Sequence, residues 1–346
     1  MKEEFEVHSH KRYNILTGEW VLVSPHRSRR PWQGEEEEAV LNQCESYDSN
    51  CYLCPGNRRV NGDINPEYGE TFVFDNDFPA LEKREKSSKM ETGLLKAVGE
   101  SGICRVVCFS PDHSKSLADM SVSEIERVVS VWQNEYEQLG RLQNINYVQI
   151  FENKGSIMGC SNPHPHGQIW AQESIPNEVL KKDIHQKKYF KEHGSILIND
   201  YLKQELKIKE RIVFENQLVV VLVPFWAVWP FEVMILPKES LSHIGLMGSS
   251  LKNEFAEAIK RLTGCYDQLF NCSFPYSSGI HQAPTDSENH DHWHWHMSFY
   301  PPLLRSATIK KFMVGYELLA MPQRDFTAEK ATEILRSKMG QNDKIE

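Results

Sequence analysis

The sequence predicts an α+β fold made of two similar halves, and two observations support this prediction. Each half reads strand, helix, strand along the chain. Each half also ends on closely spaced histidines, His164 and His166 in the first and His292, His294 and His296 in the second. The same order of elements occurring twice indicates a duplicated α+β unit. We therefore divide the chain into an N-terminal half, residues 1–176, and a C-terminal half, residues 177–346.

The first half begins with two predicted strands around a Thr-Gly turn within residues 13–23. Further strands are predicted over residues 105–109 and 145–151. A helix is predicted over residues 122–139, because Ser121 and Glu124 form a capping box and apolar residues then follow the helical spacing up to Gly140.

The second half repeats this order. Strands are predicted over residues 218–223 and 231–236, followed by a helix that carries Leu251, Phe255, Ile259 and Leu262, and then a strand over residues 293–300. The charged stretch 177–210 is expected to be helical at the surface. A last helix is expected to follow Thr327 and to stop at Gly340. The charge runs 35–38 and 83–89 are typical of solvated loops.

Composition limits the class of protein. Hydrophobic residues make up 40% and charged residues 25% of the chain, as in ordinary globular proteins. No apolar run reaches the roughly 18 residues that a membrane span needs, and the acidic N-terminus lacks a signal peptide core. The net charge of −9 argues against a nucleic-acid partner. We expect a cytoplasmic protein, whose eight cysteines would be free thiols or metal ligands.

Cys51 and Cys54 form a C-x-x-C motif that has three interpretations: a zinc knuckle, a redox motif or coincidence. A redox motif places its first cysteine at a helix start, whereas Pro-Gly-Asn follows directly here and forms a turn, which favours the knuckle. Structural zinc is nearly always four-coordinate. His113 and His164 are the two further ligands that the first half offers, with hydrogen-bonded histidines without metal as the alternative.

The segment around His164-Pro165-His166-Gly167-Gln168 is the most informative in the chain. Residues two apart in an extended chain face the same side, so His164, His166 and Gln168 are expected to line one face. Gly167 is expected to let a ligand approach the backbone closely. A neutral imidazole is a competent nucleophile near pH 7, which makes His166 a candidate nucleophile. A purely structural histidine is the alternative that the spacing leaves open.

Long motifs occur in order along nearly the whole chain and carry a family resemblance. They are Arg12-Tyr13-Asn14, Ser24-Pro25-His26-Arg27, Arg30-Pro31-Trp32-Gln33-Gly34, Ser110-Pro111-Asp112-His113, Phe151-Glu152-Asn153-Lys154-Gly155, residues 161–170, residues 300–306 and residues 311–317. With these segments the chain resembles the galactose-1-phosphate uridylyltransferase family, the transferase branch of the histidine-triad superfamily.

The resemblance implies a fold of two histidine-triad-like halves, each an antiparallel sheet flanked by helices, in a homodimer. It implies transfer of UMP from UDP-glucose to galactose-1-phosphate, as in galactose metabolism, with ping-pong kinetics and a covalent uridylyl-His166. The partners would be UDP-glucose, UDP-galactose and hexose 1-phosphates. The other ring nitrogen of His166 would donate to a backbone carbonyl. Ser161 and Gln168 would hydrogen-bond the phosphoryl oxygens, and Zn²⁺ would be structural.

The resemblance also assigns substrate contacts. The family's positions around the uridine and its phosphates are matched by Asn76, Asp77, Phe151 and Asn153. Arg27 and Arg30 match basic residues that contact phosphate across the dimer. The hexose-binding segment is matched by Lys311, Phe312, Val314, Tyr316, Glu317 and Gln323. Each active site would then need both subunits.

One part of the family pattern is altered. Some members carry a second metal, often iron, held by one Glu and three His. His281 and His296 match two of these positions, but Lys182 stands at the Glu position and Ser298 at the last His position. A cation in place of an anionic ligand disfavours a divalent ion at this site. The replacement ligands that the sequence offers are Asp183, His292 and His294, the two histidines being expected to share a strand face with His296; surface histidines or a packing network are the alternatives.

Three other functions stay open. The leading alternative is another nucleotidylyltransferase or phosphorylase of the same superfamily that acts on a different nucleotide sugar. The match of residues 311–323 favours a hexose, but the spacing does not reveal the base or the sugar. A hydrolase is opposed by Gln168, because hydrolytic relatives carry a third histidine there. A zinc-stabilised binding module without catalysis is opposed by the acidic net charge and by the pairing of His166 with Gln168.

Overall fold

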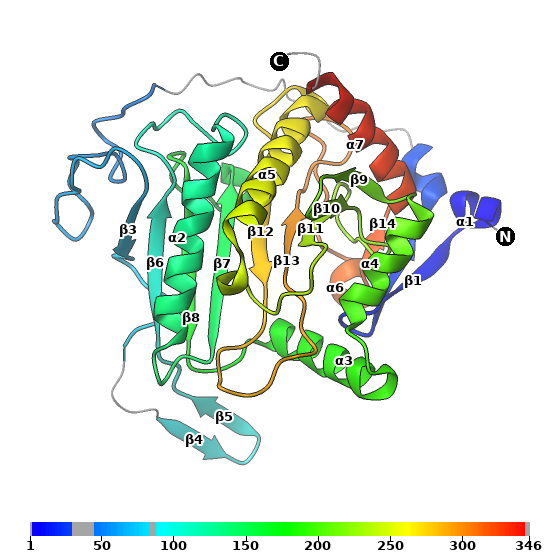
Figure 1. The fold of residues 1–346 in the computed structure, drawn as a ribbon, viewed down its shortest axis with the longest axis horizontal. Coiled ribbons are helices and arrows are strands. Elements are labelled where there is room, and N and C mark those ends of the chain that lie inside the picture. Colours follow the sequence, from blue (N-terminus) through cyan, green and yellow to red (C-terminus); the bar gives the residue numbers. More distant parts are fainter. Residues whose placement is uncertain (1, 30–44, 84–87, 343–346) are drawn as a thin grey trace.

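The computed structural model describes residues 2–29, 45–83 and 88–342 (Figure 1). The predicted charge run 35–38 lies outside these residues. Within them, nine strands form one large sheet whose pairings are all antiparallel. In order across the sheet, they are β3 (Phe72–Asp75), β6 (Gly102–Cys108), β8 (His166–Gln172), β7 (Tyr147–Lys154), β12 (Tyr276–His281), β13 (His296–Tyr300), β11 (Val233–Pro237), β10 (Val219–Leu222) and β9 (Ile212–Glu215).

The predicted α+β class with antiparallel sheets is confirmed, but the two halves do not form separate sheets. β7 of the first half pairs with β12 of the second, with Asn153 opposite Ser277 and Phe151 opposite Gly279. Either strand alone would leave a row of unpaired N–H and C=O groups at the edge of its sheet. Edge-to-edge pairing satisfies both rows and makes one continuous sheet.

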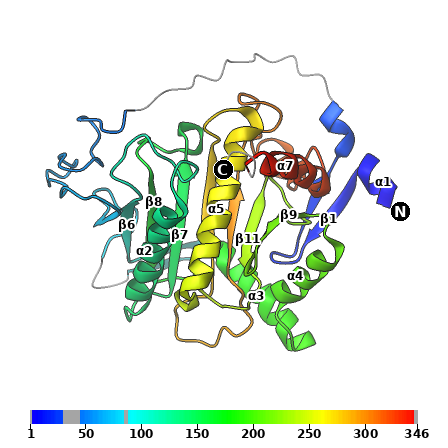
Figure 2. The ribbon, with the colours of Figure 1, turned by 45° about the horizontal axis from the view of Figure 1, so that its top comes forward.

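One face of the sheet is covered by α2 (Val122–Gly140), α5 (Ser249–Phe270) and α7 (Ala328–Asn342), which lie in front of the strands (Figures 1 and 2). The largest hydrophobic core lies between these helices and the sheet. The predicted capping box of α2 is present in full, with Ser121 and Glu124 each accepting from the other's backbone. The Thr327 hydroxyl accepts from the Lys330 N–H at the start of α7, as expected of an N-cap.

The opposite face is covered in part. Near β9, β10 and β11 it is covered by α4 (Leu197–Ile208), by β2 (Glu19–Val23) and by the turn that joins β2 to β1 (His10–Asn14). The stretch 177–210 is helical as predicted, forming α3 (Asn177–His193) and α4, but α4 is not a plain surface helix, because it buries Leu197, Ile198, Tyr201 and Leu202. The central strands β8 and β7 keep half-buried side chains on this face.

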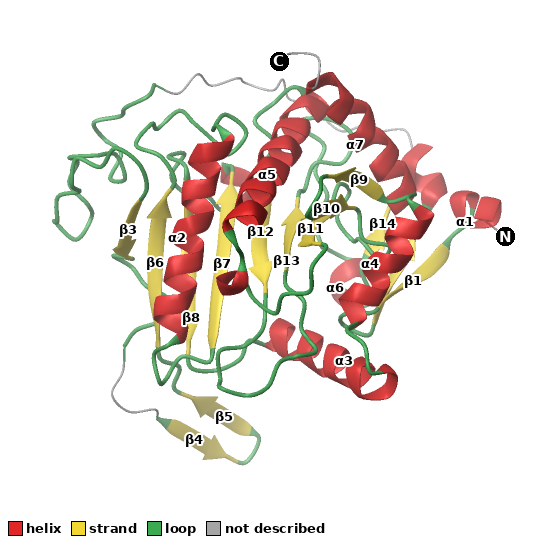
Figure 3. Ribbon diagram, viewed as in Figure 1, coloured by secondary structure: helices red, strands yellow, loops and turns green. Residues whose placement is uncertain are grey.

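The remaining elements are small (Figure 3). β1 and β2 enclose the predicted turn and join β14 (Gln323–Arg324) in a separate sheet. β4 (Lys89–Thr92) and β5 (Leu95–Val98) form an exposed hairpin, so Lys89 belongs to a strand instead of the predicted loop. The short helices are α1 (Lys2–Val7), α6 (Tyr316–Leu319), η1 (Pro25–Arg29), η2 (Ser156–Met158) and η3 (Ile244–Leu246). No helix among the described residues has the length and apolar character that crossing a membrane requires.

Candidate active site and metal centre

Strand β8 presents the candidate nucleophile through its alternation. Gly167, Ile169 and Ala171 are buried, while His166, Gln168 and the residues two apart after them are half-buried. The first set faces the core under α2, because Ile169 and Ala171 belong to that core. The second set therefore shares the open face of the sheet, as predicted for His166 and Gln168. His164, which was expected on the same face, precedes the strand and is buried instead.

His166 is held in one tautomer by the backbone. Its Nδ1 lies 2.7 Å from the carbonyl oxygen of His164, and because a carbonyl can only accept, Nδ1 carries the proton. The lone pair is then on Nε2. Burial lowers the pKa of His166, which favours the neutral, nucleophilic form of the ring.

Two amide side chains beside His166 have their oxygens engaged. Trp170 Nε1–H donates to Gln168 Oε1 at 3.0 Å, and the Ser277 hydroxyl donates to Asn153 Oδ1 at 2.6 Å. Each amide therefore keeps its NH₂ group as a donor for another acceptor. His166, Gln168 and Asn153 line a small cavity of about 40 Å³ together with Gly159, Cys160, Ser161 and Gly167.

Gly167 lines the cavity beside His166, and it is also tightly packed on its other side. A Cβ atom there would lie 2.8 Å from the Phe109 ring and 3.0 Å from the Phe151 carbonyl oxygen. The close approach is thus made by the neighbouring strand and an aromatic ring, and only glycine leaves them room.

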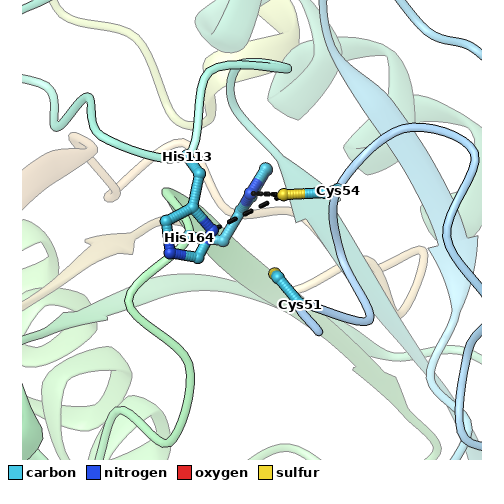
Figure 4. A group of neighbouring side chains, drawn as sticks. All are labelled: Cys51, Cys54, His113 and His164. Carbon is cyan, nitrogen blue, oxygen red and sulfur yellow. Dashed lines mark hydrogen bonds between the residues drawn. The ribbon is translucent and has the colours of Figure 1, made fainter. Parts of the chain in front are cut away.

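Next to this cavity, Cys51, Cys54, His113 and His164 come together from three separate segments, all of them buried (Figure 4). Their potential ligand atoms lie within 4.8 Å of one another. His113 Nδ1 and His164 Nδ1 each lie 3.6 Å from Cys54 Sγ. A tetrahedral zinc ion with its usual bond lengths separates sulfur and nitrogen ligands by about 3.6 Å, so the arrangement fits such an ion.

The surroundings of this cluster also fit a metal centre. His164 Nε2 donates to the Ser110 carbonyl oxygen at 2.9 Å, which leaves Nδ1 unprotonated toward Cys54, as second-shell partners of metal-bound histidines do. Burial lowers the pKa of His164 to about 4 and raises the pKa of Cys54 to about 11. A divalent cation would supply the missing positive charge and stabilise the thiolate.

Comparison with known proteins gives a consistent result. The family model described as "Galactose-1-phosphate uridyl transferase, N-terminal domain" matches residues 1–176, and the corresponding C-terminal domain model matches residues 182–344. The chain belongs to the galactose-1-phosphate uridylyltransferase family. It is therefore an enzyme of the nucleotidylyltransferase class.

Individual members of the uridylyltransferase family resemble the chain along nearly its whole length. The Haemophilus influenzae galactose-1-phosphate uridylyltransferase is 51% identical, covering 95% of this chain and 94% of the relative. The Saccharomyces cerevisiae enzyme is 47% identical, covering 98% and 96%. A solved structure described as "Structure of uridylyltransferase" superposes with a TM-score of 0.77 at 26% identity, covering 96% and 99% of the two chains.

The segment that resembles the family's hexose site lies far from His166 in the fold. Gln323 lies on β14 in the small sheet, at the opposite end of the molecule from β8 (Figure 1). The Lys311 ammonium donates to Glu317 at 2.5 Å and to Gln323 at 3.4 Å. Arg27 joins the same cluster through Asp325, which also accepts from Gln323. Sequence reasoning missed Asp325, although its carboxylate links Arg27 to the segment.

The other residues with predicted substrate contacts are distributed as follows. Phe312, Val314 and Tyr316 are exposed by 56%, 57% and 49%. Phe151 lies opposite Gln168 and packs edge-on against Trp170, on the face of His166. Asn76 and Asp77 follow β3; the Asp77 carboxylate lies 3.5 Å from the Arg59 guanidinium, a partner that sequence reasoning did not find. Arg30 lies outside the described residues.

The altered second metal position is filled by a side chain. Lys182 Nζ lies 2.8 Å from His281 Nδ1, and His281 pairs across the sheet with His296. Burial lowers the pKa of Lys182 to about 7 and that of His281 far below its usual range. A divalent ion does not fit beside this amine, so the residues present do not support metal binding there.

The proposed replacement ligands are only partly brought together. β13 begins at His296, so His292 and His294 do not share a strand face with it. His294 instead hydrogen-bonds Asn199. Asp183 and His292 do meet, and a third residue, His290, completes a cluster that could hold a metal ion. His290 carried no sequence signal, because it lies in a loop whose path no local pattern predicts.

Proposed function

We propose that this enzyme transfers UMP from UDP-glucose to galactose-1-phosphate through a covalent uridylyl-His166 intermediate. The observation that carries the proposal is the hydrogen bond from His166 Nδ1 to the His164 carbonyl oxygen. It leaves the Nε2 lone pair as the nucleophile, in a cavity whose other polar groups include Ser161 and Gln168. Relatives named galactose-1-phosphate uridylyltransferase support galactose-1-phosphate as the acceptor of a uridylyl group.

In the first step, Nε2 attacks the α-phosphorus of UDP-glucose. A P–N bond forms, the bond between the α-phosphorus and the bridging oxygen breaks, and glucose-1-phosphate leaves with that oxygen and its electron pair. Nδ1 keeps its proton, so the positive charge of the phosphorylated ring is stabilised by the His164 carbonyl dipole. The free NH₂ group of Gln168 and the Ser161 hydroxyl are placed to donate to the phosphoryl oxygens, where charge develops.

In the second step, a phosphate oxygen of galactose-1-phosphate attacks the same phosphorus. The P–N bond breaks, and UDP-galactose leaves while His166 regains its lone pair. Two in-line displacements invert the phosphorus twice, so net retention and ping-pong kinetics are expected. Gln168 has no basic nitrogen to activate water, which favours transfer over hydrolysis.

We further propose a homodimer in which each site combines two subunits. His166 and the Lys311–Gln323 cluster lie at opposite ends of one chain, and Phe312, Val314 and Tyr316 leave large apolar surface exposed. A second copy that covers this surface would bring its own segment to the cavity at His166, and Arg27 would approach the phosphates with it. The metal at Cys51, Cys54, His113 and His164 is proposed to be structural Zn²⁺.

Intact-mass spectrometry after incubation with UDP-glucose tests the proposal. We expect a gain of one uridylyl group that is acid-labile and is discharged by galactose-1-phosphate. The adduct should be absent from His166→Gly and present in His8→Gly, an exposed histidine remote from β8. An adduct that survives in His166→Gly would exclude His166 as the nucleophile. An unmodified native enzyme would exclude UDP-glucose as the donor, and a relative acting on another nucleotide sugar would then be favoured.

A further inference from the structure

A cluster of metal-ligating side chains lies outside the site described above. Asp183 belongs to α3, and His290 and His292 belong to the loop between β12 and β13. Their potential ligand atoms all lie within 4.8 Å of one another. We propose that these three residues form a second metal site, for a divalent transition-metal ion such as Zn²⁺. It is distinct from the position of His281 and His296, which the Lys182 amine fills.

The separations between the ligand atoms are close to those that a metal requires. Nitrogen and oxygen ligands of a tetrahedral zinc ion lie about 3.4 Å apart. His290 Nδ1 lies 3.5 Å from Asp183 Oδ1, which already matches. His292 Nε2 lies 2.7 Å from the same oxygen, so this pair must open by about 0.7 Å to admit the ion, a rotation that side chains can make without moving the backbone.

The groups behind the ligands are arranged as around metal sites. His290 Nε2 donates to Asp286 Oδ1 at 2.6 Å, which leaves the lone pair on Nδ1, toward Asp183. This Nδ1 is buried and makes no hydrogen bond within the described residues, and the His290 side chain is only 9% exposed. Trp293 Nε1–H donates to Asp183 Oδ1 at 2.7 Å. A carboxylate behind a histidine and a donor on the ligating carboxylate are typical second-shell contacts.

The donor set and access indicate which ion would bind. Two imidazoles and one carboxylate suit Zn²⁺, Co²⁺ or Fe²⁺ better than Mg²⁺ or Ca²⁺, which prefer oxygen ligands. His290 lines a cavity of about 530 Å³ whose walls also carry Glu137, Glu288 and Asp291. These acidic groups favour the approach of a cation, and a water molecule would complete four-coordination of the bound ion.

The alternative for this cluster is a doubly protonated His290 held between two carboxylates without metal. The metal-bound and metal-free clusters differ in structure as well as in composition, because an ion would replace the direct contact between His292 and Asp183 by two metal bonds. Bound metal would fasten α3 to the β12–β13 loop, next to the residue Lys182 that packs on His281. We therefore expect a structural function for this site.

Metal content tests the proposal on the whole protein. After loading with Zn²⁺ and removal of free metal, the native chain should hold about two zinc ions, one at the cysteine site and one at the new site. His292→Ala should hold about one. His193→Ala, which removes an exposed histidine of α3 outside the cluster, is the matched control and should keep both. Asp286→Asn should lower the affinity for the second ion by roughly 10–100-fold.

Cobalt spectra give an independent measurement. One equivalent of Co²⁺ should show the thiolate-to-metal absorption of the Cys51 and Cys54 site. A second equivalent should add weak d–d bands without further thiolate absorption, because its ligands are nitrogen and oxygen. Saturation after the thiolate-bound equivalent, or a second ion that His292→Ala retains, would overturn the proposal.

Discussion

The ring of His166 donates a hydrogen bond to the backbone carbonyl of His164, 2.7 Å away, and His164 is itself a member of the metal cluster. A metal ion bound to this cluster would therefore hold the residue that fixes the tautomer of His166. This relationship links the buried cluster to the ring of His166 at the sheet surface. It predicts that losing the metal disturbs the geometry of the nucleophile as well as the stability of the fold.

Removal of the metal is the first test of this link. Cys54→Ser should lower the free energy of unfolding by at least about 3 kcal/mol, since structural zinc sites contribute about 10 kcal/mol in small domains, and formation of the uridylyl adduct should slow. Urea unfolding and the rate of adduct formation measure the two effects. Cys272→Ser, a half-buried cysteine outside the cluster, should change neither. Full adduct formation in metal-free Cys54→Ser would show that the reactivity of His166 does not depend on the metal cluster.

The amide of Gln168 is oriented by Trp170. Trp170→Phe removes the donor to Gln168 Oε1, so the amide can turn its oxygen toward the phosphoryl group. A lost hydrogen bond of about 1 kcal/mol corresponds to a rate reduced by roughly 5- to 10-fold. Gln168→Glu replaces the donor with a negative charge and should cost about 100- to 1,000-fold. Single-turnover kinetics with UDP-glucose measure both, and equal effects of the two variants would contradict the assigned orientation.

Gly167 should tolerate no side chain. In Gly167→Ala the new Cβ meets the Phe109 ring at 2.8 Å and the Phe151 carbonyl at 3.0 Å, and such overpacking costs about 1–3 kcal/mol. The free energy of unfolding in urea measures this loss. Gly69→Ala is the matched control, because nothing lies within 4 Å of a Cβ atom there. An unchanged stability of Gly167→Ala would mean that β8 can shift away from Phe109.

Mixing two inactive variants tests the shared active site. His166→Gly lacks the nucleophile, and Lys311→Ala lacks a residue of the hexose-binding segment. If each site combines two subunits, half of the randomly mixed dimers contain one intact site, and about one quarter of the native activity returns. Sites built within one chain would return none. Activity measured after unfolding the variants together and refolding them decides between these outcomes.

Acid stability should depend on Glu329, which ties α7 to β1. Its carboxylate accepts from Arg12 at 2.8 Å and 3.1 Å and from Arg211 at 2.6 Å. Burial alone would raise its pKa, but these guanidinium groups lower it from 4.5 to about 2. The folded state then binds fewer protons than the unfolded state between these values. The stabilisation is complete above pH 4.5 and is lost as the pH falls through about 2.

The matching variant isolates this contribution. As the pH falls through that window, the free energy of unfolding of the native protein should decrease by on the order of 2–3 kcal/mol more than that of Glu329→Gln. Glu333→Gln, on the exposed side of the same helix, should titrate like the native protein. Urea unfolding at several pH values gives the difference in unfolding free energy between the two proteins. Acid releases the metal from both proteins alike, so its effect cancels in this difference. Parallel curves for native protein and Glu329→Gln would show that the ion pairs contribute nothing.

Much of this protein follows from local sequence. The capping box of α2 and the hairpin of β1 and β2 are short-range patterns, and each produced the predicted element. The two-residue spacing likewise predicted that His166 and Gln168 share a face. The cluster of Cys51, Cys54, His113 and His164 was also predicted, because few side chains can satisfy a four-coordinate ion. Tertiary structure alone decided that β7 pairs with β12, that Lys182 reaches His281, and that His290 meets Asp183. These contacts join distant segments, and their partners depend on how edges pair and helices dock, which no periodicity in the chain encodes.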